Sequence, residues 1–224
     1  MVQTTEKKYN DFFLRTDIMK KIALDVDGVI LNFGEQYLNV AQEVLQRPLS
    51  PDFSKYKLQD FLQVSATEDT IVWNYFNEKN HWKNIVPFPN VQEALKRIID
   101  FNYEIFIVSA INPIHETARL INLKELGLVP TQIHCVGENN APKHEIISQI
   151  HPHIFIDDRL DHLYRSSDVE HLGWVNQNQL QSVEYTGGVF EVSSLYEWTE
   201  KHLENISQLL EKKDTVKGMS KRIF

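Results

Sequence analysis

Two aspartates at the end of a short apolar run are the residues of this chain best suited to chemistry. Asp25 and Asp27 flank Val26, follow the apolar segment 22–24 and precede Gly28, which permits a sharp change of direction. The apolar run predicts a buried parallel strand, so we expect both carboxylates on the same side of its carboxyl end, where open α/β sheets bind ligands. Two carboxylates this close repel each other unless a cation or a proton lies between them. A bound divalent metal, together with a proton shared with substrate, would remove this repulsion.

Further polar residues stand at comparable positions later in the chain. Ser109 ends the apolar run 104–109, Lys143 begins a helical pattern, and the pair Asp157–Asp158 closes the run 154–156. Each has an ordinary structural alternative: a solvated strand-end turn for the aspartates, a strand-end cap for Ser109 and a solvated helix start for Lys143. Their joint occurrence in this order favours a shared site.

The elements that must position these groups alternate between strand and helix. Strands are predicted at 21–26, 104–109, 132–136 and 154–156, with shorter ones at 173–176 and 189–192, and helices at 33–45, 91–99, 115–126, 143–150 and 195–210. This alternation predicts an α/β fold with a doubly wound parallel sheet.

The predicted domain organisation has an interrupted core. Residues 52–86 carry short helical patterns and many aromatic side chains but no strong strand signal, so 32–86 is predicted to be a small helical cap inserted after the first strand. The core domain then comprises 1–31 and 87–212, and residues 213–224 form a flexible tail. The first 20 residues show no pattern that indicates chemistry.

Four stretches together resemble the haloacid dehalogenase (HAD) superfamily of phosphotransferases. They are residues 24–29, 107–109, 141–143 and 155–159, and they span about 20–160. The resemblance implies a HAD-like, Rossmann-type core and a Mg²⁺-dependent phosphomonoester hydrolase that forms an aspartyl-phosphate.

The aspartates and the two phosphate-binding residues have distinct roles in such a reaction. Asp25 is the expected nucleophile, because a carboxylate attacking phosphorus divides one difficult step into two easier ones. Asp27 is placed to protonate the departing alkoxide and then to deprotonate the attacking water. Ser109 donates to one phosphate oxygen and Lys143 neutralises another, as the charge of phosphoryl transfer requires.

Magnesium is the expected cofactor, since it prefers hard oxygen ligands and retains waters. The expected ligands are Asp25, the main-chain carbonyl of Asp27 and one acid of the later pair. In the HAD superfamily the second acid usually ligates directly, which implies Asp158 as the ligand and Asp157 in indirect contact.

The cap region is similar to that of the 5′(3′)-deoxyribonucleotidases. The matching features are the short helical cap, Phe33 six residues after Asp27, the Pro87-x-Pro89 return and the ending 156–159. The resemblance implies that cap aromatics hold a base, with Phe33 assigned by spacing and Trp73, Phe76 and Trp82 by residue type only. The alternative is that these aromatics form the small core of the cap.

Composition limits the partners. The net charge of −8 over 224 residues argues against a nucleic-acid polymer, because no basic stripe is present to neutralise phosphates. A small phosphorylated metabolite, with a nucleotide favoured, is the expected partner, and the sequence leaves the oligomeric state open. The single cysteine, Cys135, fits a reducing compartment, and no apolar run suits a membrane span or a signal peptide, so a cytoplasmic location is expected.

Three other interpretations fit part of this pattern. A phospho-accepting receiver domain has similar groups, but its lysine comes last and it has no cap, whereas here Lys143 precedes Asp157. A non-catalytic phosphate-binding member of the fold is disfavoured because every motif group is present. Among enzymes, the alternative to a nucleotidase is a HAD phosphatase acting on a sugar phosphate or another small phosphomonoester.

Overall fold

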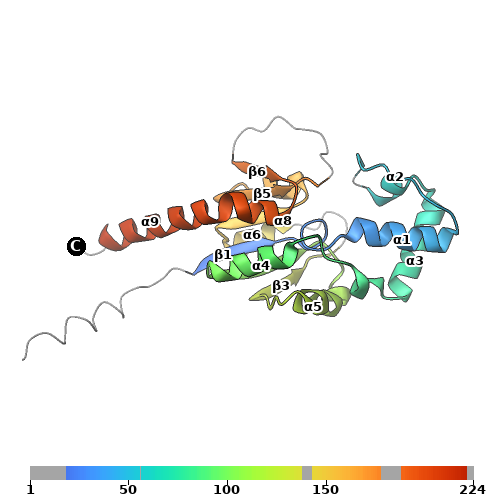
Figure 1. Cartoon of the computed structure of the whole chain (residues 1–224), viewed down its shortest axis with the longest axis horizontal. Helices are drawn as coiled ribbons and strands as arrows, with labels where there is room; N and C mark the ends of the chain where they lie inside the picture. Colours follow the sequence, from blue (N-terminus) through green and yellow to red (C-terminus); the bar gives the residue numbers. More distant parts are fainter. Residues whose placement is uncertain (1–18, 56, 138–142, 178–187, 221–224) are drawn as a thin grey trace, which may run out of the picture.

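A single parallel sheet forms the centre of the molecule (Figure 1). The computed structural model describes residues 19–55, 57–137, 143–177 and 188–220. The strands are β1 (Lys20–Leu24), β2 (Tyr103–Ser109), β3 (Gln132–Cys135), β4 (Ile154–Asp157), β5 (His171–Val175) and β6 (Val189–Val192), and their order across the sheet is β3-β2-β1-β4-β5-β6. All five pairings are parallel, which confirms the predicted doubly wound α/β sheet.

The middle strand β1 is buried on both faces, as expected for a parallel sheet covered by helices. Leu24 pairs in register with Ile107 of β2 and with Ile156 of β4. Because of this register, the residues one or two positions further along each strand path, which are Asp25, Ser109 and Asp157, lie at the same edge of the sheet.

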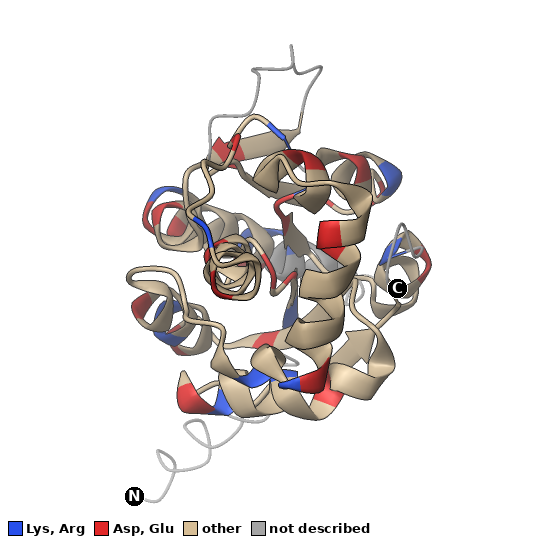
Figure 2. Ribbon diagram, turned by 90° about the vertical axis from the view of Figure 1, so that its right-hand side faces the viewer, with Lys and Arg blue, Asp and Glu red and all other residues tan. Residues whose placement is uncertain are grey.

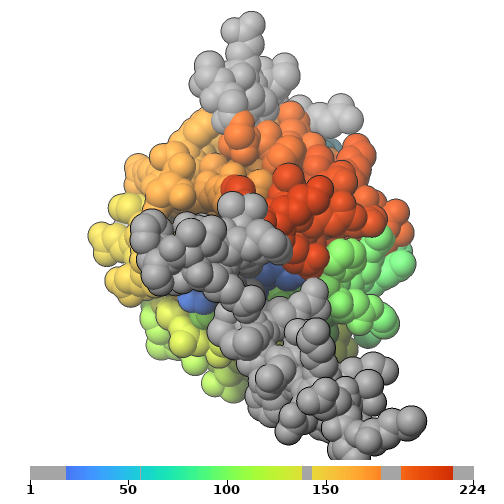
Figure 3. All heavy atoms as spheres, turned by 90° about the vertical axis from the view of Figure 1, so that its left-hand side faces the viewer, coloured from blue at the N-terminus to red at the C-terminus, as the bar shows by residue number. Residues whose placement is uncertain are grey.

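Helices cover both faces. They are α1 (Phe33–Leu45), α2 (Leu58–Leu62), α3 (Ala66–Glu78), α4 (Val91–Asp100), α5 (Glu116–Glu125), α6 (Lys143–Ile150), α7 (Leu160–Arg165), α8 (Leu195–Trp198) and α9 (Glu204–Ser220), with the short helical segments η1 (His81–Asn84), η2 (Pro113–His115) and η3 (Thr199–Leu203). One hydrophobic cluster joins one face of the sheet to α4, α8 and α9, and a second joins the other face to α6 and α7. Figure 3 shows atoms of the last helices (red) beside those of α4 (green).

The segment between β1 and α4 contains the helices α1, α2, α3 and η1, which lie at one end of the molecule (Figures 1 and 2). Figure 2 looks onto this end and shows acidic and basic residues interspersed. The chain enters and leaves the segment along adjacent paths. Leu31 forms an isolated antiparallel bridge with Pro87, the Asn32 amide donates to the Val86 carbonyl over 2.8 Å, and the Phe88 amide donates to the Ile30 carbonyl over 3.0 Å.

Two predictions of element boundaries differ from the structure. Strand β1 ends at Leu24, so the side-chain alternation of a strand does not govern Asp25 and Asp27. The final helix is divided into α8, a π-helical turn η3 and α9, and α9 continues to Ser220, so the predicted tail is helical as far as that residue. The predictions for residues 1–18 and 221–224 lie outside the described residues. In the described part of the chain, no helix is both long and apolar enough to cross a membrane.

Candidate active site

The predicted strand-end residues converge at the carboxyl edge of the sheet. Asp25 follows β1 and donates its main-chain amide to the Ile156 carbonyl of β4 over 3.0 Å. Asp157 is the last residue of β4, Ser109 is the last residue of β2, and Lys143 is the first residue of α6. The sheet register therefore assembles residues that are far apart in the sequence.

Lys143 is the cationic centre of this group. Its side chain is buried, and its Nζ atom lies 2.6 Å from Asp25 Oδ2 and 2.8 Å from Asp157 Oδ2. Burial alone would lower the pKa of the Lys143 ammonium, but the charges of Asp157 and Asp25 outweigh it and raise the pKa. The ammonium therefore remains charged at neutral pH, which suits it to neutralise an anion.

Asp25 lies against Lys143 in a buried position. Its Oδ1 atom also accepts the Val26 amide over 2.7 Å. Burial raises the pKa of Asp25 to about 6, with the charge of Asp157 adding to the rise and that of Lys143 opposing it. Additional positive charge beside this carboxyl would favour the ionised, nucleophilic form.

Asp157 is fully engaged by protein donors. Lys143 binds Oδ2, the Arg159 amide donates to Oδ1 over 2.8 Å, and His162 Nδ1 lies 3.2 Å from both oxygens. Burial would raise the pKa of Asp157, but Lys143 and His162 outweigh it and lower the pKa to about 2. His162 was missed from the sequence, although its place on the helix directly after the acidic pair was a usable signal.

Asp158 has the opposite environment. Its Oδ1 atom is buried and has no hydrogen-bond partner among the described residues. Burial, reinforced by the charges of Asp157 and Asp25, raises the pKa of Asp158 well above its ordinary value. A buried carboxylate oxygen without a donor is unfavourable unless a cation or a proton compensates it.

The three carboxylates form a group that fits a hard divalent cation. One oxygen each from Asp25, Asp157 and Asp158 lie within 4.8 Å of one another. Because Asp158 Oδ1 has no donor among the described residues, it is the carboxylate oxygen of this group best able to bind Mg²⁺ directly. Asp25, which Lys143 and the Val26 amide contact, stays the second predicted ligand. The Asp27 carboxylate is not in this group, and the predicted contribution of its main-chain carbonyl stays a prediction.

Gly28 is required by the close approach of Asp158. Its φ angle is +85°, and a Cβ atom built on it would lie 2.3 Å from Asp158 Oδ2. Any larger residue would therefore both strain the backbone and displace the Asp158 carboxylate.

Asp27 has a different partner, Arg119 of α5. The Arg119 Nη2 atom contacts both carboxylate oxygens of Asp27, at 2.6 Å for Oδ1. Burial raises the pKa of Asp27, and the Arg119 guanidinium opposes that rise. Arg119 was also missed from the sequence, although an arginine between the apolar-face residues Ala118 and Leu123 of a predicted helix is an unusual placement.

Ser109 is buried at the end of β2, and its Oγ atom has no hydrogen-bond partner in the described part of the chain. A free hydroxyl beside the carboxylate cluster is suited to donate to a ligand oxygen. Arg159, by contrast, is paired with Asp161 over 2.8 Å.

The aromatic side chains of the helical segment pack on one another. Phe33 stacks on Trp73 and Trp82, with ring centroids 6.0 and 5.6 Å apart, and meets Phe76 edge-on. Phe76 and Trp82 are buried, which fits the alternative that they are core residues of this segment. Phe33 and Trp73 are only partly buried, so the predicted base-binding role of Phe33 stays a prediction.

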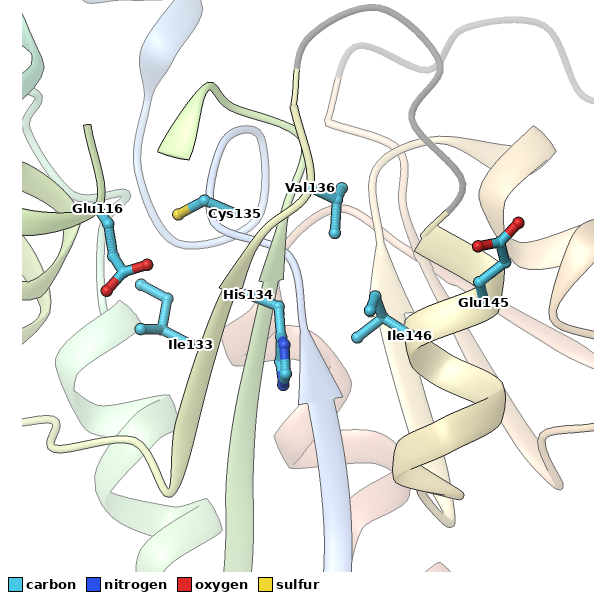
Figure 4. A pocket seen from close by; sticks show the side chains of 7 residues that line it. All are labelled: Glu116, Ile133, His134, Cys135, Val136, Glu145 and Ile146. Carbon is cyan, nitrogen blue, oxygen red and sulfur yellow. The ribbon is translucent and has the colours of Figure 1, made fainter. Parts of the chain in front are cut away.

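An open hollow of about 430 Å³ lies elsewhere, at the edge strand β3. Figure 4 shows Glu116 on one side of β3, Glu145 on the other, and His134 and Cys135 on the strand itself. Its described lining includes two glutamates and neither lysine nor arginine, which makes it a poor site for a phosphate. The carboxylate cluster is the better candidate for phosphate chemistry because Lys143 lies within it.

Comparison with protein families decides the classification. The family described as 5′ nucleotidase, deoxy (pyrimidine), cytosolic type C protein (NT5C) matches residues 18–164, which include β1, Ser109, Lys143 and the acidic pair. The chain belongs to this family. As a member of this HAD-like deoxynucleotidase family, it is a hydrolase of phosphomonoesters. A search of curated proteins found no match.

Solved structures confirm the HAD-like fold. A HAD phosphatase from Thermococcus onnurineus is 20% identical over 81% of this chain and 97% of its own, with a TM-score of 0.51. A HAD family hydrolase from Deinococcus radiodurans R1, solved with bound phosphate and sodium, is 13% identical over 84% of this chain and 97% of its own, with a TM-score of 0.57. YfnB from Bacillus subtilis, described as a HAD-hydrolase bound to magnesium, is 14% identical over 81% of this chain and 97% of its own. Its TM-score is 0.55.

Proposed function

We propose that this member of the NT5C family is a Mg²⁺-dependent 5′-nucleotidase that hydrolyses (deoxy)nucleoside monophosphates through an aspartyl-phosphate on Asp25. The observation that carries the proposal is the buried cluster in which Lys143 contacts Asp25 and Asp157 while Asp158 Oδ1 has no donor among the described residues. Such a cluster supplies a nucleophile, a fixed positive charge and an oxygen site for a cation.

The first half-reaction is the transfer of the phosphoryl group to Asp25. A carboxylate oxygen of Asp25 forms the new bond to phosphorus as the bond from phosphorus to the nucleoside oxygen breaks. The Ser109 hydroxyl and the Lys143 ammonium stabilise the charge on the equatorial oxygens. Asp25 and Asp158 would hold Mg²⁺, which would supply further charge neutralisation.

Proton transfer is assigned to Asp27. Its carboxyl protonates the nucleoside alkoxide as it leaves and, once ionised, takes a proton from the water that hydrolyses the aspartyl-phosphate. The side chain of Asp27 is 22% exposed, whereas that of Asp25 is only 7% exposed, which supports contact with the leaving group and with water.

Nucleotide recognition is assigned to the helical segment 32–86, which we propose acts as a cap. Phe33 is the first residue of α1 and is only partly buried, so part of its side chain is open to contact a base. A sugar phosphate is the alternative substrate, and the burial of Phe76 and Trp82 favours it by reducing the aromatic surface open to a base. The family description, which includes the words cytosolic type, supports a cytoplasmic location.

The test is hydrolysis of a panel of deoxynucleoside monophosphates, ribonucleoside monophosphates and sugar phosphates with Mg²⁺ present. We expect the highest kcat/KM with a nucleoside monophosphate. Higher values with a sugar phosphate would favour the alternative, and no turnover of any phosphomonoester would overturn the proposed function.

A further inference from the structure

Arg119 is a fully buried arginine in a helix whose other buried residues are mostly apolar or neutral. Burying a guanidinium is unfavourable unless it is paired, so the partners of Arg119 indicate the role of this residue. Nη2 contacts both carboxylate oxygens of Asp27, whereas Nε and Nη1 have no hydrogen-bond partner among the described residues. The Asp27 carboxylate is therefore the principal anionic partner of Arg119.

A second contact holds the Arg119 guanidinium. Its central carbon lies 5.1 Å from the centre of the Trp82 ring, which is itself stacked on His115 at 4.5 Å. Trp82 is held in turn by a 2.8 Å hydrogen bond from its Nε1 to Asn77. Arg119 thus contacts both an aromatic ring that is itself held in place and the Asp27 carboxylate.

The helix that carries Arg119 is fixed to the same segment by an independent contact. Asn122, one turn further along α5, donates to the Lys83 carbonyl of η1 over 3.0 Å. This contact joins the two elements without touching Asp27. Asn122 therefore offers a matched control for the purely structural consequences of loosening α5 from η1.

From this geometry we infer that Arg119 is a positioning residue, which holds the Asp27 carboxyl in the orientation needed to protonate the leaving group. This inference rests on the proposed function, in which Asp27 is the general acid. The Asp27 side chain follows the end of β1 and is partly exposed, so without Arg119 it would be free to occupy several rotamers.

A positioning role of this kind predicts a dependence on the leaving group. A weakly basic leaving group departs without a proton, whereas an alkoxide requires one from Asp27. Loss of Arg119 should therefore change kcat/KM little for a substrate with a weakly basic leaving group and lower it greatly for a substrate that releases an alkoxide. A merely structural role would lower both rates equally.

The experiment compares wild-type protein with Arg119→Met and Asn122→Leu on 4-nitrophenyl, phenyl and benzyl phosphate. These substrates each carry one aromatic ring, and their leaving groups increase in basicity in that order. We expect Arg119→Met to reduce kcat/KM for benzyl phosphate by roughly 10- to 100-fold, less than the full loss of a general acid because Asp27 itself is retained, and to leave 4-nitrophenyl phosphate nearly unchanged. Asn122→Leu should change all three by one common factor.

A double-mutant cycle tests whether Arg119 acts through Asp27. In an Asp27→Asn background, Arg119→Met should cause no further loss with benzyl phosphate, because the group that it positions is already disabled. If Arg119→Met does not fold, Arg119→Lys carries the same comparison, since lysine keeps the charge but not the planar fork.

Two outcomes would overturn the inference while leaving the proposed function intact. One is an equal loss on all three phosphates, and the other is no loss on any of them. Wild-type protein that hydrolyses none of the three, nor any nucleotide, would instead overturn the proposed function and the positioning role with it.

Discussion

At the scale of single residues, Gly28 permits a test of the Asp158 position that leaves every charged group in place. Gly28→Ala should abolish metal-dependent activity, because the added methyl group would lie against the Asp158 carboxylate and the residue would keep an unfavourable positive φ angle. Gly34→Ala is the matched control, since a Cβ atom there meets no atom within 4 Å. Phosphatase assays and titration with Mg²⁺ would check both variants, and full activity of Gly28→Ala would contradict the assigned position of Asp158.

The nucleophile can be tested by a nearly isosteric change. Asp25→Asn should abolish turnover while preserving the fold, because an amide can still contact Lys143 but cannot attack phosphorus. Asp161→Asn, which removes a surface carboxylate paired with Arg159, should retain activity. More than a few per cent of the wild-type rate in folded Asp25→Asn would rule out Asp25 as the nucleophile.

The places of candidate site residues could be predicted from the sequence where a polar group interrupts an apolar run, whereas their catalytic roles stay predictions. Asp25, Ser109 and Asp157 were found in this way, since the ends of parallel strands meet at one edge of a sheet. Arg119 and His162 were not found, because each lies inside a helix whose buried face the sequence indicates only through its apolar members. Their importance depends on contacts with Asp27 and Asp157 that no local pattern contains.

At the scale of elements, the helical segment can be tested through Phe33. If its ring stacks on a base, Phe33→Ala should lower kcat/KM for a nucleoside monophosphate by roughly 10- to 100-fold and leave a small phosphoester without a ring almost unchanged. Phe53→Ala is the control, because Phe53 lies in the same segment, is exposed and contacts only Phe61 among the ring pairs described. Equal losses on both substrates would show that Phe33 serves packing alone.

The packing of β6 against η3 predicts a dependence of stability on pH. Phe190 of β6 stacks on His202 and His171, and burial holds the pKa of each histidine below its ordinary value of 6.5. Glu197 and Glu170 oppose this shift, whereas the charges of Lys201 and Lys213 add to it. Between the lowered pKa and 6.5 the unfolded chain binds more protons than the folded chain, so the free energy of unfolding should fall as the pH drops below about 6.5.

Urea denaturation at about pH 7.5 and about pH 5.5 would measure this effect. We expect the difference between the two pH values to be smaller in His202→Gln than in the wild-type protein. His151→Gln, an exposed histidine elsewhere, should leave the difference unchanged. An identical pH dependence in His202→Gln and wild-type protein would contradict the prediction.

The strands, and the helices with a clear apolar face, were predicted well from the sequence. The spacing of apolar residues and the length of each apolar segment distinguish a strand from a helix. All six predicted strands are present within a few residues of their expected ends. The π-helical turn η3 was not predicted, since the apolar spacing of Leu195, Trp198 and Leu203 is compatible with one continuous helix. The π turn packs against α4, and its His202 stacks on Phe190 of β6, which are contacts that the local sequence does not reveal.

At the scale of the whole molecule, metal binding should stabilise the folded chain. The carboxylates of Asp25 and Asp158 lie close together and repel each other, so Mg²⁺ bound by them should raise the Tm, and chelation should lower it and abolish activity. Asp158→Asn should raise the Tm of the metal-free protein and remove its response to Mg²⁺. Calcium should restore activity poorly, because its looser coordination misplaces the nucleophile.

Thermal unfolding with chelator, Mg²⁺ and Ca²⁺ would check these expectations. For a chain of this size, each 1 kcal/mol of added stability corresponds to about 2–4 °C in Tm. Asp161→Asn again serves as the control, with an unchanged response to Mg²⁺. Full activity after exhaustive chelation would show that the carboxylate cluster does not require a metal.

The adjacent paths of residues 30–32 and 86–88 have a consequence for how this architecture can diversify. Because the Leu31–Pro87 bridge brings the two ends of the helical segment together, the segment leaves and rejoins the core at one point. Its length can therefore change without shifting the register of β1 against β2, and lengthening a loop closed in this way costs little conformational entropy. Evolution can thus exchange one such module for another while the catalytic edge of the sheet is inherited intact.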